Sequence, residues 1–166
     1  MYLLTLLMTW ASPVHAKEPA CVNDAFDGEL LFAESVWDLD HGNASSSFDI
    51  HRIRSLVVRL ETSTPLDTVE IEALVFITPN GLRLYESQSV FSADPALTQV
   101  TSNEYVNDLP VRPMTELADG DMALDQLIPI AGTVFQRPSR LGIWEVEATL
   151  RGRKGTVFGT FEFLGP

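Results

Sequence analysis

The chain has 166 residues, with 23 acidic and 11 basic side chains and a formal net charge of −12. So acidic a chain is a poor partner, taken as a whole, for nucleic acid or an anionic lipid surface. Its single cysteine excludes a disulfide within the chain, so apolar packing has to stabilise the fold.

Residues 1–16 have the pattern of a secretory signal peptide. An apolar run over 2–10 is followed by small residues and Pro13, and Val14 and Ala16 occupy the −3 and −1 positions of a cleavage site. The run is too short to span a bilayer, and the usual positive N-terminal region is missing. We expect export to the periplasm or the cell exterior, against the alternative of a buried N-terminal strand or helix. Cleavage before Lys17 leaves 150 residues (166 − 16), which is one domain without a transmembrane segment.

Residues 17–28 are expected to form an N-terminal tail ahead of a domain over 29–166. The tail carries Cys21, the odd cysteine of an exported chain. A free thiol without a role is the leading interpretation, while intermolecular pairing and lipidation are alternatives. Lys17 and Glu18 disfavour lipidation because they interrupt the small, apolar stretch that it needs.

Period-two alternation between turn residues, typical of strands with one buried face, dominates the rest of the chain. Residues 68–78 are the clearest case, with Val69, Ile71, Ala73, Val75 and Ile77 on one face and Glu70 and Glu72 beginning the other. The link over 62–67 is expected to be a hairpin loop, and Asn80-Gly81 a tight turn. Strands are expected over 29–37, 54–61, 68–78, 82–91, 127–133, 142–150 and 156–164.

Two segments interrupt this pattern. Residues 38–51 are polar and serine-rich, and residues 101–125 are long, acidic and contain two prolines. Loops of that length in a compact domain are usually functional or disordered. No segment shows a convincing helical stripe.

The C-terminal hairpin carries a resemblance at the level of the fold. The run Leu141-Gly142-Ile143-Trp144-Glu145-Val146-Glu147-Ala148-Thr149-Leu150 and its partner Phe161-Glu162-Phe163-Leu164 resemble the last strand pair of immunoglobulin-like domains in exported bacterial proteins. The paired cysteines of true immunoglobulin domains are absent. We expect an all-β, antiparallel β-sandwich of immunoglobulin-like type, with about seven to eight strands. Such folds serve many purposes, so the resemblance implies no single activity.

No motif of catalysis is present, neither a nucleophile elbow, nor a zinc-protease helix, nor a phosphate-binding loop. We therefore expect no enzyme activity and no required cofactor. Calcium is a possible ligand, because Asp38, Asp40 and Asp49 fall at positions 1, 3 and 12 of an EF-hand-like count. The glycine stands at position 5 instead of 6, so a solvated loop is the alternative.

Two other surfaces are candidates for binding. Trp37, beside the polar loop, could stack on a sugar ring, whereas Trp144 is expected in the core. The basic turn with Arg151, Arg153 and Lys154 could dock on an acidic surface, such as Asp119 and Asp121 of a neighbouring copy.

The sequence thus predicts a non-catalytic protein–protein interaction or assembly module of the cell envelope, binding a protein partner or itself. Pairing through an edge strand is a second route to a partner. The alternative is a ligand-binding sandwich for glycan or calcium.

Overall fold

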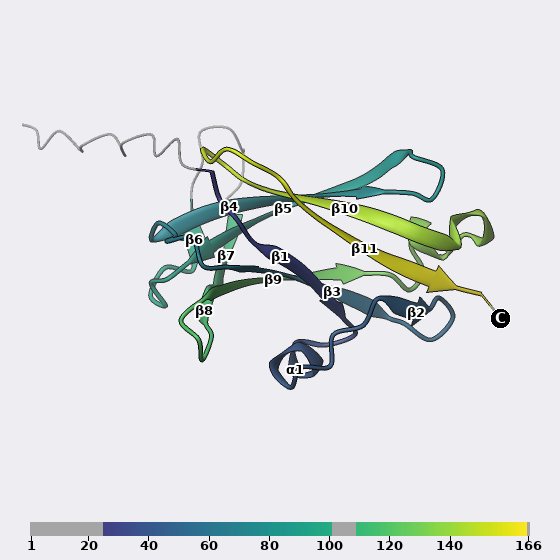
Figure 1. Ribbon diagram of the computed structural model, residues 1–166, viewed down its shortest axis with the longest axis horizontal. Helices are drawn as coiled ribbons and strands as arrows, with labels where there is room; N and C mark the ends of the chain where they lie inside the picture. The colour runs from purple at the N-terminus through teal and green to yellow at the C-terminus, as the bar shows by residue number, and fades with distance from the viewer. Residues whose placement is uncertain (1–24, 101–108, 166) are drawn as a thin grey trace, which may run out of the picture.

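The computed structural model describes residues 25–100 and 109–165, which form two β-sheets packed face to face (Figure 1). One sheet has four strands in the order β1-β3-β9-β8, and the other has seven in the order β2-β11-β10-β4-β5-β7-β6. The elements are β1 (Glu29–Ala33), α1 (Val36–Asp40), β2 (Ser47–Asp49), β3 (Ser55–Thr62), β4 (Val69–Ile77), β5 (Arg83–Ser92), β6 (Gln99–Val100), β7 (Leu109–Pro113), β8 (Thr115–Glu116), β9 (Met122–Pro129), the 3₁₀ turns η1 (Val134–Gln136) and η2 (Pro138–Arg140), β10 (Gly142–Leu150) and β11 (Val157–Leu164).

The all-β class is confirmed, and the strands outnumber the expected seven to eight because several are very short. β2, β6, β7 and β8 have two to five residues each. β2 lies in the polar segment 38–51, and β7 and β8 lie in the acidic segment 101–125. Two pairings, β2 with β11 and β5 with β7, are parallel, while the other described pairings are antiparallel. No described helix has the length and apolar character needed to cross a membrane.

β4 buries the face that begins with two glutamates. Glu70, Glu72, Leu74 and Phe76 point into the sandwich, and the row from Val69 to Ile77 lies on the outer face, where it is half-buried. Judged by alternation alone, the row of five apolar side chains from Val69 to Ile77 would be assigned to the core. The inward carboxyl groups are tolerated because each has a polar partner inside the protein.

The link over 62–67 is not a hairpin. It carries the chain from β3 in the four-stranded sheet to β4 in the seven-stranded one. The hairpins β4–β5 and β10–β11 do form as expected, and Gly81 closes the first of them with φ of +79°. Gly81 suits this turn because other residues rarely adopt a positive φ.

The core lies between the sheets and is rich in aromatic rings, among them Trp144, which is fully buried as expected and donates from Nε1 to the Arg140 carbonyl at 2.8 Å. Along one flank of the sandwich, β11 approaches β1. A Cβ atom on Gly159 would lie 2.7 Å from the Leu30 Cβ and 2.9 Å from the Phe32 Cζ. Gly159 thus makes room for β1.

Part of the expected tail also packs on the fold. Phe26 is buried in the core, and its backbone N–H donates to the Lys154 carbonyl at 3.1 Å. The signal segment 1–16 and Cys21 lie outside the described residues.

Helix α1 was missed by the sequence reading, which extends the first strand to Trp37. β1 ends at Ala33, and the Ser35 hydroxyl caps the helix by accepting from the Asp38 N–H at 3.2 Å. Leu39 packs on Ala33 and Val57, so the helix covers part of the outer face of the four-stranded sheet.

Candidate functional site

The basic turn expected to meet a partner is partly used inside the protein. The Arg153 side chain is only 5% exposed, and its Nη2 lies 2.5 Å from the Oε1 of Glu70, which is itself 3% exposed. This ion pair holds the turn against β4, while Arg151 and Lys154 are exposed.

Asp119 and Asp121, the expected acidic partners of that turn, lie in the tight connection between β8 and β9. The Asp121 N–H donates to the Asp119 carboxylate at 3.1 Å, and the Asp121 carbonyl accepts from Leu117 at 2.8 Å. Asp119 is exposed and Asp121 half-buried. The two turns belong to different sheets, and no described contact joins them.

The three aspartates considered for calcium do not converge. The Asp38 carboxylate accepts from the Ser35 hydroxyl at 2.6 Å, Asp40 accepts from Arg59 at 2.7 Å, and Asp49 lies 3.6 Å from Arg52. Across the described ranges, no group of three His, Cys, Asp or Glu side chains could hold a metal ion. The loop geometry therefore gives calcium no support.

Trp37, the candidate for stacking on sugar, is 62% exposed on α1. Its ring already stacks on His41, with the centroids 4.1 Å apart and the planes at 25°. One face of the indole is thus covered within the protein.

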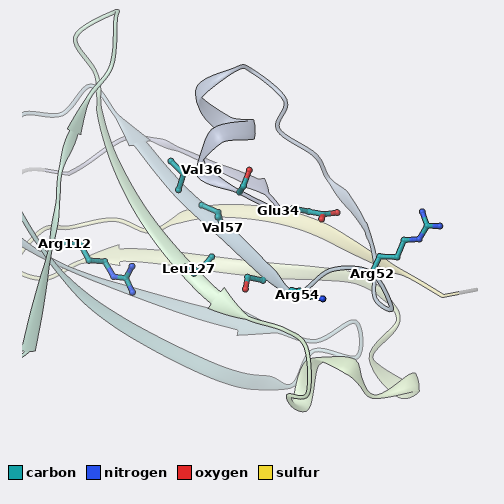
Figure 2. Close-up of a pocket in the computed structure, with 9 residues that line it drawn as sticks. Glu34, Val36, Arg52, Arg54, Val57, Arg112 and Leu127 are labelled. Atoms are coloured by element: carbon teal, nitrogen blue, oxygen red, sulfur yellow. The ribbon is translucent and has the colours of Figure 1, made fainter.

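A groove that the sequence did not reveal lies beside α1, on the outer face of the four-stranded sheet (Figure 2). Its volume is about 570 Å³. Its apolar side chains are Val36 at the start of α1, Val57 of β3 and Leu127 of β9. Val57 is buried, whereas Val36 is 41% and Leu127 52% exposed. The groove therefore offers accessible apolar surface on a rigid base.

The polar part of the groove is mainly cationic. Arg52, Arg54 and Arg112 line it together with one carboxylate, that of Glu34. Figure 2 shows Arg112 at one end and Arg54 and Arg52 at the other, with Leu127 between them. Among the described residues, Arg52 pairs with Asp49, while Arg54 and Arg112 form no ion pair.

A buried ionic network lies beside the groove, on the same outer face of the four-stranded sheet. Arg59 of β3 is 1% exposed, and its Nε donates to Asp125 of β9 at 2.7 Å while its Nη2 donates to Asp40 of α1 at 2.7 Å. The hydrogen bond with Asp125 raises the pKa of Arg59, so the guanidinium stays charged. The network thus ties α1, β3 and β9 together and keeps the groove in shape.

A second cavity, of about 230 Å³, adjoins the groove, because Arg112 and Leu127 line both. Tyr85, Ser87, Gln88 and Ser89 of β5 contribute to its polar lining together with Arg112. It opens on the flank of the sandwich where β5 and β9 approach each other.

A chain of hydrogen bonds crosses the interior behind this flank. Ser87 donates to the Gln126 Oε1 at 2.8 Å, and the Gln126 Nε2 donates to the Glu72 Oε2 at 2.8 Å. The other carboxyl oxygen of Glu72 is buried without a hydrogen-bond partner. Burial raises the pKa of Glu72 to about 8, although the Gln126 hydrogen bond acts in the opposite direction. These hydrogen bonds link the two sheets through a carboxyl group whose raised pKa favours the protonated form at neutral pH.

The arrangement suits binding of a segment that is both apolar and negatively charged. Guanidinium groups form paired hydrogen bonds with carboxylates, and the exposed leucine and valine contribute apolar contact. The sequence signal for this site was weak but present. Residues 17–125 contain only six basic side chains, and three of them, Arg52, Arg54 and Arg112, line the groove.

No protein-family model, curated protein or solved structure matches the chain.

Proposed function

We propose that this protein is a non-catalytic, exported interaction module of the cell envelope, which docks a partner protein in the arginine-lined groove beside α1. The observation that carries the proposal is the coincidence of accessible apolar side chains with two arginines that have no ion-pair partner among the described residues. In a chain with a net charge of −12, such a site attracts an acidic partner locally, against the general repulsion.

The groove also has the composition of a binding site for protein. Interfaces combine a buried apolar centre with a charged rim and are enriched in arginine. Leu127 and Val36 would form the centre, and the arginines the rim. Rigid support comes from the Arg59 network beside the groove, on the same face of the sheet.

The type of sandwich and the basic turn between β10 and β11 belong to the same proposal. The two packed sheets and the inter-sheet link over 62–67 support an immunoglobulin-like type of sandwich. Lys154 and Arg151, both exposed, are a second and weaker docking surface.

Site-specific photo-crosslinking tests the proposal. Benzoylphenylalanine replaces Leu127 in the groove or Phe158 on the other sheet, which is 60% exposed and serves as the matched control. We expect the Leu127 position to form a discrete protein adduct in the envelope fraction of the source cell. The adduct should disappear when Arg54 and Arg112 are both changed to glutamate. Identical adducts at both positions, or an adduct that is indifferent to the arginines, would refute the proposal.

A further inference from the structure

One edge of β9 has no strand beside it in the described part of the chain. β3 pairs along the whole of one side of β9, from Met122 to Pro129. On the other side, β8 pairs only with Met122 and Ala123. In the part of the chain that the structure describes, no strand therefore pairs with residues 124–129 on that side. At about 3.3 Å per residue, the open edge is about 20 Å long.

This edge lacks the devices that usually prevent strand addition. Natural edges are commonly blunted by lysine, by an inward charge, by a bulge or by proline. The 124–129 segment contains no lysine, and no bulge is found in the pairing of β3 with β9. Asp125 is already bound to Arg59, and Pro129 stands only at the end. The edge is thus able to accept another strand.

The groove lies directly beside the open edge. Leu127 is one of its lining residues, and its register partner across β3, Val57, is another. Side chains of an added strand would alternate between the two faces of the sheet. Every second side chain would therefore lie over the groove, and the intervening ones would face the smaller cavity with Tyr85, Ser87 and Ser89.

We propose that the partner binds by adding an extended segment to the 124–129 edge of β9, a segment in which one apolar residue is flanked two positions away on each side by a carboxylate. The apolar side chain packs on Leu127, and the two carboxylates reach Arg112 at one end and Arg54 at the other (Figure 2). Residues two apart on a strand share a face and lie about 7 Å from each other, so this spacing puts all three side chains in the groove. The inference rests on the proposed function, and it specifies the mode of binding and the chemistry of the partner.

Two peptides of identical composition test the pattern. In Thr-Glu-Thr-Val-Thr-Glu-Thr, both glutamates share a face with the valine, whereas in Thr-Thr-Glu-Val-Glu-Thr-Thr they lie on the opposite face. Titration of each capped peptide into the full chain is followed through the backbone amide signals in NMR spectra. We expect the first peptide to shift the signals of β9 and to slow their exchange with solvent, and to bind about ten-fold more tightly than the second. Equal binding would overturn the proposed pattern.

Reversal of charge provides the matched set of protein variants. Arg54→Glu and Arg112→Glu should each weaken binding of the first peptide about five- to ten-fold, because an attraction is replaced by a repulsion. Arg137→Glu, an exposed arginine outside the groove, should leave it unchanged. If all three variants weakened binding equally, the peptide would be responding to the overall charge of the protein. The assignment of Arg54 and Arg112 as its contacts would then be wrong.

N-methylation separates strand addition from docking by side chains alone. Successive N–H groups of a strand point to opposite sides, so only one of two peptides, methylated at the third or at the fourth residue, loses a hydrogen bond to β9. We expect one of them to bind at least ten-fold more weakly than the other. If both bind like the parent peptide, strand addition is wrong, while docking in the groove stands. If no peptide binds and Leu127 forms no arginine-dependent adduct, the proposed function itself fails.

Discussion

Glu72→Gln is expected to stabilise the protein at alkaline pH, which is an unusual result for a substitution in the core. Glu72 is fully buried, one of its oxygens has no partner, and burial raises its pKa to about 8. Asp125 adds to the upward shift, while Arg112 opposes it. Glutamine has nearly the same shape and no proton to lose, and its side-chain oxygen can still accept from Gln126.

The magnitude follows from the two pKa values. Between pH 4.5, the ordinary value, and pH 8, folded Glu72 holds a proton that the unfolded chain has lost. Stability therefore falls as pH rises through this window, by up to about 1.4 kcal/mol per unit. Over the 3.5 units (8 − 4.5) the loss from this one group approaches about 5 kcal/mol, and it is absent in Glu72→Gln.

Urea unfolding at pH 5, 7 and 9 measures this difference. We expect the variant and the parent protein to differ by less than about 1 kcal/mol at pH 5, and the variant to be several kcal/mol more stable at pH 9. Glu70→Gln, two residues along the same buried face, is the control. It should lower the free energy of unfolding, whereas Glu72→Gln should raise it at alkaline pH. Glu70→Gln leaves Arg153 without its closest partner and should cost about 3–5 kcal/mol. A parallel pH dependence of Glu72→Gln and the parent protein would refute the argument.

Three further predictions concern packing, the ionic network and metal. Gly159→Ala should cost about 1–3 kcal/mol in urea unfolding, because its Cβ would lie 2.7 Å from Leu30, and an unchanged midpoint would mean that β1 moves away freely. Arg59→Met should cost about 3–5 kcal/mol at pH 7, since it leaves Asp125 unpaired, and the double variant with Asp125→Leu should recover most of the loss. Millimolar calcium should leave the melting temperature unchanged, because each candidate aspartate has its own partner, and a rise that Asp38→Asn abolishes would contradict this.

The alternation of apolar residues predicted the existence of the long strands well. β3, β4, β5, β10 and β11 all overlap the expected ranges, since each is long enough to show a period of two. The burial of the glutamate face of β4 could not be inferred from its pattern, for a physical reason. Its outer row is apolar, and its inner row begins with two glutamates whose charge is paired by Arg153 or removed by protonation. Those partners are distant in sequence, so the pattern on β4 alone contains no sign of them.

The groove could not be assembled from the sequence for a similar reason. Arg54 precedes β3, Arg112 is on β7, and Leu127 is on β9, so only the strand order and the packing of the two sheets bring them together. That order depends on the link over 62–67, which crosses between sheets where the sequence suggested a hairpin. Helix α1 was missed because five residues are too few to show a helical stripe, although Ser35 and Asp38 have the spacing of a cap.

The position of β11 has a consequence for the time course of folding. β11 pairs with β10 and β2 and packs on β1, so segments from both ends of the described chain meet at this strand. During synthesis, β1 and β2 emerge from the ribosome long before their neighbour exists. Until then, the slot beside β10 and the ring cluster that receives Phe161 and Phe163 stay open. A chain with so many distant contacts is expected to fold slowly, in milliseconds to seconds, and to do so only after β11 has emerged. We expect that in this interval the β11 strand of a second chain can enter the same position beside β10, so an exchanged dimer is one misfolded product of this topology.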